Sequence, residues 1–515
     1  MSEVSFHTRL RQLAADVPER SALLCGGADI SYAQLWQRIE RATERLAREW
    51  KVAPGERIAY LGLNHDAQLV LLAALMRIGA LLVPLNYRLS RAELRAIVAH
   101  AGVTQLIADE QFATIASALG PVVRERAALD AAPGPGAAGA PGGAEVASLG
   151  SRAAGAPAGA EVDAQSPALL VYTSGTTGRP KGAVHTHGGL YWNALASIAM
   201  HDFTAGDTVL TALPLFHVGG LCIQTLPALY AGARVILHPR FDPGAWLDAL
   251  ERERPTVSLM VPATMRAVQE HPRWRDADLS SLRLLGAGSS TIPDTLIDGF
   301  HRRGIPVCQI YGATETGPVS IVLSADEAFA HAGAAGRPAL NCAIRLVGEH
   351  GDIEDDGAVG EIWVRGPNVM QGYWRDPDNA AYAGGWFHTG DLAWRDSQGY
   401  YTVVGRAQDM IISGGENIYP AEIENVLAGM AEIAEATVLG VPDPQWGEVP
   451  VAVIVLRAGA ALSEAVIRAR FDGVLARFKQ PRRIVFRATL PRNAMGKVIK
   501  SELIESLSPQ AGQGL

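Results

Sequence analysis

The sequence predicts an α/β protein in which a large N-terminal domain precedes a small C-terminal domain. Its 515 residues exceed the length of an ordinary single domain, 48% of them are apolar, and short apolar runs alternate with segments of helical periodicity. The apolar run at 57–63 and the helix-like stretch at 67–78 are typical of a βαβ unit. We therefore expect a large domain of α/β sheets with a β-barrel-like part, followed by a small, mobile α+β domain.

The same alternation continues through the chain and sets the expected domain boundary. Further apolar strand candidates lie at 168–172, 235–238, 257–261 and 282–285, with helical segments such as 244–252 between them. Residues 131–160 are almost wholly Ala, Gly and Pro, which predicts a flexible insertion without a core of its own. β-rich runs follow residue 360, so the large domain is expected at 1–407 and the small domain at 408–515.

Composition and charge exclude several classes of partner. The net charge of −8 offers no basic surface for nucleic acid or anionic lipid. Neither a leader segment nor an apolar run long enough to span a membrane is found in the sequence, so a cytoplasmic protein is expected. The four cysteines have no paired spacing, which argues against a zinc site and a disulfide framework. We expect His185 and His187 to be satisfied or exposed histidines rather than metal ligands. The oligomeric state stays open, and a homodimer is allowed.

The most informative motif is YTSGTTGRPKG at 172–182, which follows an apolar strand candidate. Gly175 and Gly178 allow the backbone to turn sharply and direct N–H groups toward an anion, and Lys181 adds a positive charge. The motif lacks the Gly-Lys-Ser/Thr ending of a P-loop, so ordinary NTPase chemistry is not favoured. The predicted phosphate-binding residues are Thr173, Ser174, Gly175, Thr176, Thr177, Gly178 and Lys181.

This loop resembles the signature of the acyl-adenylate-forming superfamily, which contains acyl-CoA synthetases, firefly luciferase and the adenylation domains of peptide synthetases. The segment YGATE at 311–315 is similar to the adenine and metal motif of that family. The resemblance implies that Tyr311 stacks on the base, Thr314 contacts the α-phosphate and Glu315 holds Mg²⁺. By the same resemblance, Gly288, in GAGSS at 286–290, belongs to the floor of the adenine and acyl sites, and Gly312 is a cofactor-binding residue of the adenine and metal motif.

The C-terminal third carries further motifs in the family's order. In WFHTGD at 386–391, Asp391 resembles the carboxylate that binds both ribose hydroxyls, and Arg406 matches an arginine that also approaches the ribose. The hinge position is Gln408, where the family usually has Asp or Lys. Lys497, in LPRNAMGKV, matches the catalytic lysine. Gly414 and Gly415, in SGGENIYPAE, match a loop that lines the pantetheine tunnel after the small domain rotates.

The resemblance implies an AMP-forming acid–thiol ligase that uses ATP, Mg²⁺ and coenzyme A. The acid would be joined to AMP with release of pyrophosphate, and a thiol would then accept the acyl group. An adenylation module for amino acids is not favoured, because the family's Asp is replaced by His217, a candidate catalytic residue here. A catalytically silent binding protein is also not favoured, since the central motif residues are present. An acyl-AMP ligase that feeds a carrier protein shares every ATP motif and stays open.

The expected substrate has an uncharged tail. By resemblance, the acyl group lies among five windows that contain no Asp, Glu, Lys or Arg: 217–220, 260–264, 286–290, 311–313 and 316–319. A second carboxylate or an ammonium buried there without a partner would cost several kcal/mol, which disfavours diacids and amino acids. Glycines in these windows leave room for an extended or bulky group. We expect a medium- or long-chain fatty acid, and the alternative is an aryl or alicyclic acid of the coumarate or benzoate kind.

Overall fold

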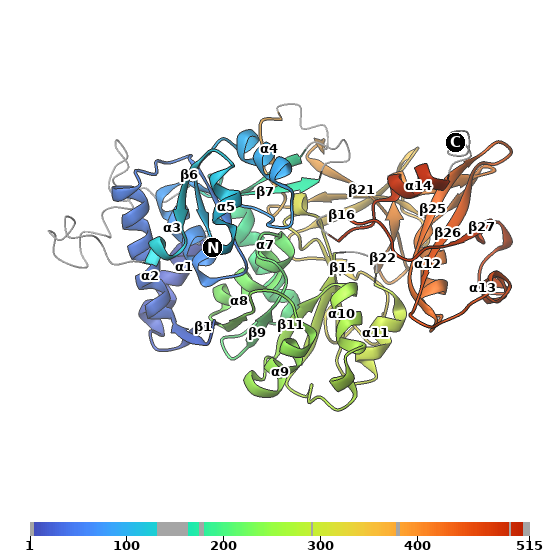
Figure 1. Ribbon diagram of the computed structural model, residues 1–515, viewed down its shortest axis with the longest axis horizontal. Coiled ribbons are helices and arrows are strands. Elements are labelled where there is room, and N and C mark those ends of the chain that lie inside the picture. Colours follow the sequence, from blue (N-terminus) through green and yellow to red (C-terminus); the bar gives the residue numbers. More distant parts are fainter. Residues whose placement is uncertain are drawn as a thin grey trace.

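The computed structural model describes residues 5–130, 163–174, 180–289, 292–376, 382–493 and 496–507. Four sheets organise these residues, and helices pack between and around the first two (Figure 1). This is a mixed α/β fold with a small C-terminal part, which confirms the predicted fold class. The insertion predicted at 131–160 lies outside the described residues.

The first sheet has seven strands and contains the antiparallel pair β7 and β8. Its order is β19 (Gly372–Tyr373), β8 (Pro180–Thr186), β7 (Pro167–Ser174), β4 (Leu81–Pro84), β3 (Arg57–Leu61), β5 (Val103–Ala108) and β6 (Val122–Glu125). The strands from β7 to β6 run parallel, and β8 returns antiparallel to β7. The strands expected at 57–63 and 168–172 are β3 and β7.

The second sheet has nine strands, and its central strands all point the same way. Its order is β15 (Arg337–Pro338), β14 (Ile321–Val322), β13 (Val307–Tyr311), β12 (Leu284–Gly288), β11 (Val257–Met260), β9 (Thr208–Thr211), β10 (Arg234–Leu237), β1 (Ser21–Cys25) and β2 (Ala28–Ser31). The central strands from β1 to β13 are parallel. Ligands of open parallel sheets bind beyond the carboxyl ends of the strands, so the ends of β12 and β13 are where a site is expected.

Helices fill the space beside the two sheets. They are α1 (Phe6–Asp16), α2 (Tyr32–Glu44), α3 (Asp66–Ile78), α4 (Arg91–Ala101), α5 (Ala113–Ser117), α6 (Ala127–Asp130), α7 (His187–His201), α8 (Leu226–Ala231), α9 (Pro243–Glu253), α10 (Pro262–Gln269) and α11 (Asp294–His301). α3 is buried almost all round because its sequence is apolar on every side. α2 and α4 each begin with a capping box, Ser31 with Gln34 and Ser90 with Glu93, which satisfies backbone N–H groups of the first turn. None of the described helices is both long and apolar enough to cross a membrane.

The third and fourth sheets follow along the chain. The third contains β17 (Gly351–Asp352), β16 (Ala343–Gly348), β18 (Gly360–Arg365), β21 (Trp386–Arg395), β20 (Tyr382–Ala383) and β22 (Tyr401–Arg406), all antiparallel. The fourth contains β24 (Glu416–Ile418), β23 (Ile411–Ser413), β26 (Gly447–Leu456), β25 (Ile433–Asp443) and β27 (Arg483–Phe486), with helices α12 (Pro420–Ala428), α13 (Glu464–Phe471) and α14 (Lys500–Leu507). A 3-10 turn, η7 (Ala407–Asp409), joins them.

The C-terminal elements, orange to red in Figure 1, lie beside α10 and β22. Arg266 of α10 donates a hydrogen bond to the backbone carbonyl of Ala434, and Glu270 forms an ion pair with Arg457. These two contacts join the fourth sheet to the C-terminal end of α10. The division at 407/408 stays a prediction.

One group of metal-ligating residue types was not expected from the sequence. The four cysteines are free and buried. However, Cys25, His65 and Asp66 gather with ligand atoms within 4.8 Å of one another, a group that spacing did not predict. Asp66 already pairs with Arg38 and His65, and burial raises the pKa of the Cys25 thiol to about 11, so this group disfavours a metal ion.

Candidate active site

The phosphate motif forms the hairpin between β7 and β8. Thr173 lies opposite Lys181, and Ser174 lies opposite Pro180, in this antiparallel pair. The predicted residues Gly175, Thr176, Thr177 and Gly178 lie outside the described residues.

Lys181 and Glu315 meet on one tyrosine that sequence reasoning missed. Tyr373 of β19 pairs with Ala183 of β8, which brings its ring beside the hairpin. The Lys181 ammonium lies 4.9 Å from the centroid of this ring, and the Tyr373 hydroxyl donates to Oε1 of Glu315 at 2.8 Å. Burial, and secondarily the charge of Glu315, raises the pKa of Tyr373, so its hydroxyl stays protonated and remains a donor.

The turn that presents Thr314 and Glu315 depends on glycine. These residues form η6 (Thr314–Thr316) directly after β13. A Cβ on Gly312 would lie 1.8 Å from the carbonyl oxygen of Pro318, so only glycine fits there. Gly288 is constrained in the same way, because its Cβ would lie 2.4 Å from the carbonyl oxygen of Ile310. Both predicted glycines therefore permit close backbone packing at the strand ends.

Asn368 braces the same turn from outside the motif. Its buried side-chain amide donates to the carbonyl oxygens of Thr316 at 2.7 Å and Val319 at 3.2 Å. The signal in the sequence was a single Asn after Gly-Pro, which is too common in loops to single out.

Tyr311, Asp391 and Arg406 form one hydrogen-bonded cluster. Asp391 of β21 pairs in register with Arg406 of β22, and its Oδ1 lies 3.0 Å from Nε of Arg406. The Tyr311 hydroxyl donates to Oδ2 of Asp391 at 2.8 Å. Burial raises the pKa of Asp391, although Arg406 and Tyr311 both act in the opposite direction. The structure thus brings together three residues separated by as many as 95 positions in the sequence (406 − 311 = 95).

Lys497 lies within electrostatic reach of this cluster. Its backbone N–H donates to the side chain of Asn493 at 3.0 Å, and a bridge between Arg492 and Val498 closes the surrounding loop. Lys497 is solvent-exposed as a residue, but protein surrounds its ammonium group. Desolvation, and after it repulsion from Arg406, lowers the pKa of Lys497. The negative charge of Asp391 acts on it in the opposite direction.

The predicted catalytic residue His217 packs against the phenylalanine that precedes it. It follows Phe216 in the loop before the π-helix η4 (Gly219–Thr225), and the two rings are 4.9 Å apart. Burial lowers the pKa of His217 to about 4, with a further contribution from Arg88. His217 is therefore neutral at pH 7.

The remaining predicted residues lie away from this cluster. Gly414 and Gly415 form the exposed two-residue turn between β23 and β24, and both have positive φ, as a type I′ turn requires. A Cβ on Gly414 would lie 2.6 Å from the Trp446 ring. Gln408 is exposed within η7.

The two histidines next to the phosphate hairpin differ from expectation. His185 and His187 are both buried rather than exposed, and burial lowers the pKa of each to about 4. Nδ1 of His187 pairs with the Ser5 hydroxyl at 2.9 Å, whereas Nε2 of each ring has no hydrogen-bond partner among the described residues. Each is a neutral core histidine.

Comparisons with known proteins show the family of this chain. A family model for AMP-binding enzymes matches residues 10–374, and a second, for the AMP-binding enzyme C-terminal domain, matches residues 422–497. The chain is 45% identical over 490 residues to an indoleacetate–CoA ligase of Aromatoleum aromaticum, covering 94% of this chain and 95% of that protein. It is 42% identical over 491 residues to a feruloyl-CoA synthase of an Amycolatopsis species, covering 94% and 96% of the two chains.

Solved structures give the same result. o-Succinylbenzoate CoA synthetase from Bacillus subtilis, bound to its acyl-adenylate intermediate, superposes with a TM-score of 0.84 at 32% identity and covers 96% of this chain and 97% of its own. ATP-bound MatB from Rhodopseudomonas palustris superposes with a TM-score of 0.85 at 31% identity and covers 99% of each chain. The chain therefore belongs to the AMP-binding enzymes, and it is an AMP-forming acid–thiol ligase of the CoA ligase kind.

Proposed function

We propose that this enzyme activates an aromatic carboxylic acid as its acyl-adenylate and transfers the acyl group to coenzyme A. The observation that carries the proposal is the convergence of Tyr311, Asp391 and Arg406 on one side and of Lys181, Tyr373 and Glu315 on the other. The first group offers an aromatic ring and a buried carboxylate for a nucleoside, and the second offers a cation and a carboxylate for phosphates and their metal ion.

The nucleoside end of the site would rest on Asp391 and Tyr311. The Asp391 carboxylate is fixed by Arg406 and Tyr311, and it can accept hydrogen bonds from two adjacent ribose hydroxyls. The Tyr311 ring, held by the same bond, can stack on the base. Gly288 and Gly312 have no side chains, so the ends of β12 and β13 can pack closely and would leave room for the base beside them.

The phosphate end would use the β7–β8 hairpin, Lys181, Thr314 and Glu315. Oε1 of Glu315 is committed to Tyr373, which leaves Oε2 to face a hard cation, a donor that suits Mg²⁺. Mg²⁺ bound to Glu315 would neutralise charge on the phosphate oxygens as pyrophosphate leaves. Lys181 and the hydroxyls of the hairpin would hold the same phosphates.

Lys497 would act in the adenylation step. Its ammonium lies near Asp391 and Arg406, a position that suits a cation placed beside the carboxylate oxygen attacking the α-phosphorus. Bond formation to this oxygen expels pyrophosphate and leaves the acyl-adenylate. A swing of residues 408–515 about Gln408 would then withdraw Lys497 and bring in the exposed Gly414–Gly415 turn, so that a thiolate can attack the acyl carbon and expel AMP.

The aromatic class replaces the fatty acid expected from the sequence. The expectation rested on uncharged acyl windows, which admit a chain or a ring equally well, whereas the relatives named above act on indoleacetate and ferulate. The uncharged lining is consistent with both, and the similarity over nearly the full chain favours the ring.

A panel of acids tests the proposal. Pyrophosphate release and CoA thioester formation would be measured for indole-3-acetate, ferulate, benzoate, octanoate, laurate and malonate. The proposal predicts the highest kcat/KM for an aromatic acid and both products in equal amounts. A preference for laurate or malonate would contradict the aromatic assignment, and adenylate without thioester would contradict the role of coenzyme A.

A further inference from the structure

The described part of the loop that carries Lys497 is tied together by its own hydrogen bonds. This lysine loop runs from Arg492 to Val498, and these two residues form an antiparallel bridge. The side chain of Asn493 accepts a hydrogen bond from the Lys497 N–H at 3.0 Å, and the Asn493 N–H donates to the Lys497 carbonyl at 2.9 Å. The Arg492 guanidinium donates to the carbonyl oxygen of Gly496 at 2.5 Å. These bonds join the loop to itself, so they do not by themselves place the lysine in the candidate active site.

Lys500 connects the lysine loop to the rest of the site. It begins α14 directly after the loop, and its Nζ donates to Oδ2 of Asp409 at 3.1 Å. Both side chains are 28% exposed, so solvent screens this ion pair less than it screens a pair on the open surface. Asp409 lies in η7, which directly follows the end of β22 at Arg406. The pair therefore links the lysine loop to the segment that carries Arg406, the partner of Asp391.

A second carboxylate faces Lys500 from α12. Glu424 accepts hydrogen bonds from the N–H of Val438 at 2.8 Å and from the hydroxyl of Thr437 at 3.3 Å, which orient its carboxylate toward β25. Burial raises the pKa of Glu424, and the charge of Lys500 is the main influence in the opposite direction. Lys500 thus lies within electrostatic reach of carboxylates from both η7 and α12, which favours one position of its ammonium.

The charges of this ion pair also act on Lys497. Beyond desolvation and the repulsion from Arg406, Asp409 and Asp391 raise the pKa of Lys497, whereas Lys500 lowers it. Two ammonium groups near each other repel, and the negative charge of Asp409 compensates that of Lys500. The pair therefore lets Lys500 anchor the lysine loop without driving the Lys497 ammonium away.

We propose that Lys500 is a positioning residue for adenylation: its ion pair with Asp409 anchors the lysine loop to η7 and so places the Lys497 ammonium in the active site. The inference rests on the proposed function and adds a residue that acts through Lys497 and touches no substrate. Without the pair, the lysine loop would keep its own hydrogen bonds but could move relative to Arg406. A charge stabilises a transition state only while it stays at the right place, so the adenylation rate should fall.

The Lys500→Met variant tests the proposal, because methionine keeps an unbranched side chain and removes the charge. Pyrophosphate release would be measured with whichever acid of the panel above is turned over fastest. Its kcat should fall about 10- to 100-fold, and the KM for ATP should stay unchanged. Thioester formation from supplied acyl-adenylate and coenzyme A should persist, since Lys497 is proposed to leave the site before that step. Lys500→Arg keeps an ion pair and should retain most of the wild-type rate.

The pH profile separates positioning from a general effect on stability. In Lys500→Met, Lys497 loses a neighbouring positive charge and part of its desolvation, so its pKa should rise. The fall of pyrophosphate release at alkaline pH should then move to higher pH, whereas Lys500→Arg should leave it in place. Lys479→Met is the matched control, because Lys479 forms a similarly exposed ion pair with Glu422 of α12, outside the lysine loop. This control should keep the wild-type rate and pH profile.

Asp409→Asn completes a double-mutant cycle with Lys500→Met. It should lower the adenylation rate by itself. The double variant should be no slower than Lys500→Met alone, because the ion pair is already lost in that variant. Additive losses, a wild-type adenylation rate in folded Lys500→Met, or an equal loss of both half-reactions would overturn the proposal. The same loss in Lys479→Met would overturn it as well.

Failure of this proposal can be told from failure of the proposed function. A wild-type adenylation rate in Lys497→Ala would contradict the proposed role of that lysine, and a wild-type enzyme that adenylates no acid would remove the proposed function. Thermal melting followed by circular dichroism shows whether each variant folds. If Lys500→Met does not fold, Asp409→Asn carries the test, and a wild-type adenylation rate in this variant would overturn the proposal.

Discussion

Tyr373 contacts two predicted active-site residues at once: its hydroxyl donates to Oε1 of Glu315 at 2.8 Å, and its ring lies 4.9 Å from the Lys181 ammonium. Tyr373→Phe removes the hydrogen bond and keeps the ring. Glu315 should then lose its fixed orientation, so pyrophosphate release should fall about 10-fold, and the Mg²⁺ concentration needed for half-maximal rate should rise. Titration of the initial rate with Mg²⁺ measures both effects.

Tyr382→Phe is the matched control for Tyr373. The Tyr382 hydroxyl donates to the carbonyl oxygen of Met370 and not to Glu315. Its loss should leave the Mg²⁺ dependence unchanged. The same Mg²⁺ shift in both variants would show that Tyr373 acts through the fold of this region rather than through Glu315.

Lys497→Ala should abolish most of the adenylation half-reaction. Removal of one fixed charge from a transition state lowers the rate by about 10²- to 10³-fold. Thioester formation from supplied acyl-adenylate should persist, because the lysine is proposed to leave the site before that step. Equal loss of both half-reactions in a folded variant would contradict this division of roles.

The pH profile of adenylation should report the charge of Lys497. Desolvation, and after it the charge of Arg406, lowers the pKa of Lys497. The side chain is charged at low pH, and it loses this charge as pH rises through the lowered pKa. The rate of pyrophosphate release should therefore fall at a pH below that of an ordinary lysine. Lys497→Arg keeps its charge and should remove this alkaline limb, although its absolute rate is lower. An identical limb in the arginine variant would assign it to another group.

Asp391→Asn should weaken ATP binding without lowering heat stability. The loss of a charged acceptor for the ribose should raise the KM for ATP about 10- to 100-fold. Because burial raises the pKa of Asp391, the folded state holds the proton of this carboxyl more tightly than the unfolded chain does. Ionisation of Asp391 therefore destabilises the folded state once the pH rises above the pKa in the unfolded chain. The variant should therefore melt no earlier than the wild type at pH 7. Initial rates at increasing ATP concentration give the KM, and scanning calorimetry gives the melting temperature. An unchanged KM for ATP would contradict the ribose role.

Gln408→Pro should separate the two half-reactions. Proline fixes φ near −65°, so backbone rotation at this position in η7 should be blocked. Lys497 should then stay beside Asp391 and Arg406. Acid-dependent pyrophosphate release should continue for about one turnover, and thioester should not accumulate. Gln408→Ala keeps a free φ and should support both steps. Normal CoA turnover in the proline variant would place the pivot elsewhere.

The sequence alone predicted most of what depends on local pattern. Alternating apolar runs and helical periodicity placed β3, β7, β10 to β12, α3 and α9, because strand and helix periods are written in consecutive residues. Resemblance of short motifs to those of a known family also singled out Tyr311, Asp391, Arg406 and Lys497 as candidates, whose roles stay predictions. The acyl windows are uncharged, but residue type alone did not decide between a chain and a ring.

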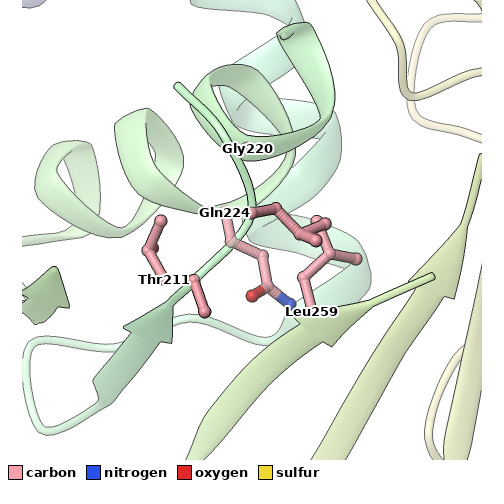
Figure 2. A pocket seen from close by; sticks show the side chains of 6 residues that line it. Thr211, Gly220, Gln224 and Leu259 are labelled. Carbon is pink, nitrogen blue, oxygen red and sulfur yellow. The ribbon is translucent and has the colours of Figure 1, made fainter. Parts of the chain in front are cut away.

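Only the tertiary structure decided which distant residues meet. Tyr373 faces Glu315 because β19 pairs with β8, and Asn368 supports η6 from a loop more than 50 residues away (368 − 316 = 52). Gln224, labelled in Figure 2, was likewise unremarkable in the sequence. His201 and Ser258, from α7 and β11, orient its buried amide, and the amide oxygen has no hydrogen-bond partner in the described part of the chain. Such a property belongs to a hydrogen-bond network among separate elements, so no local pattern can encode it.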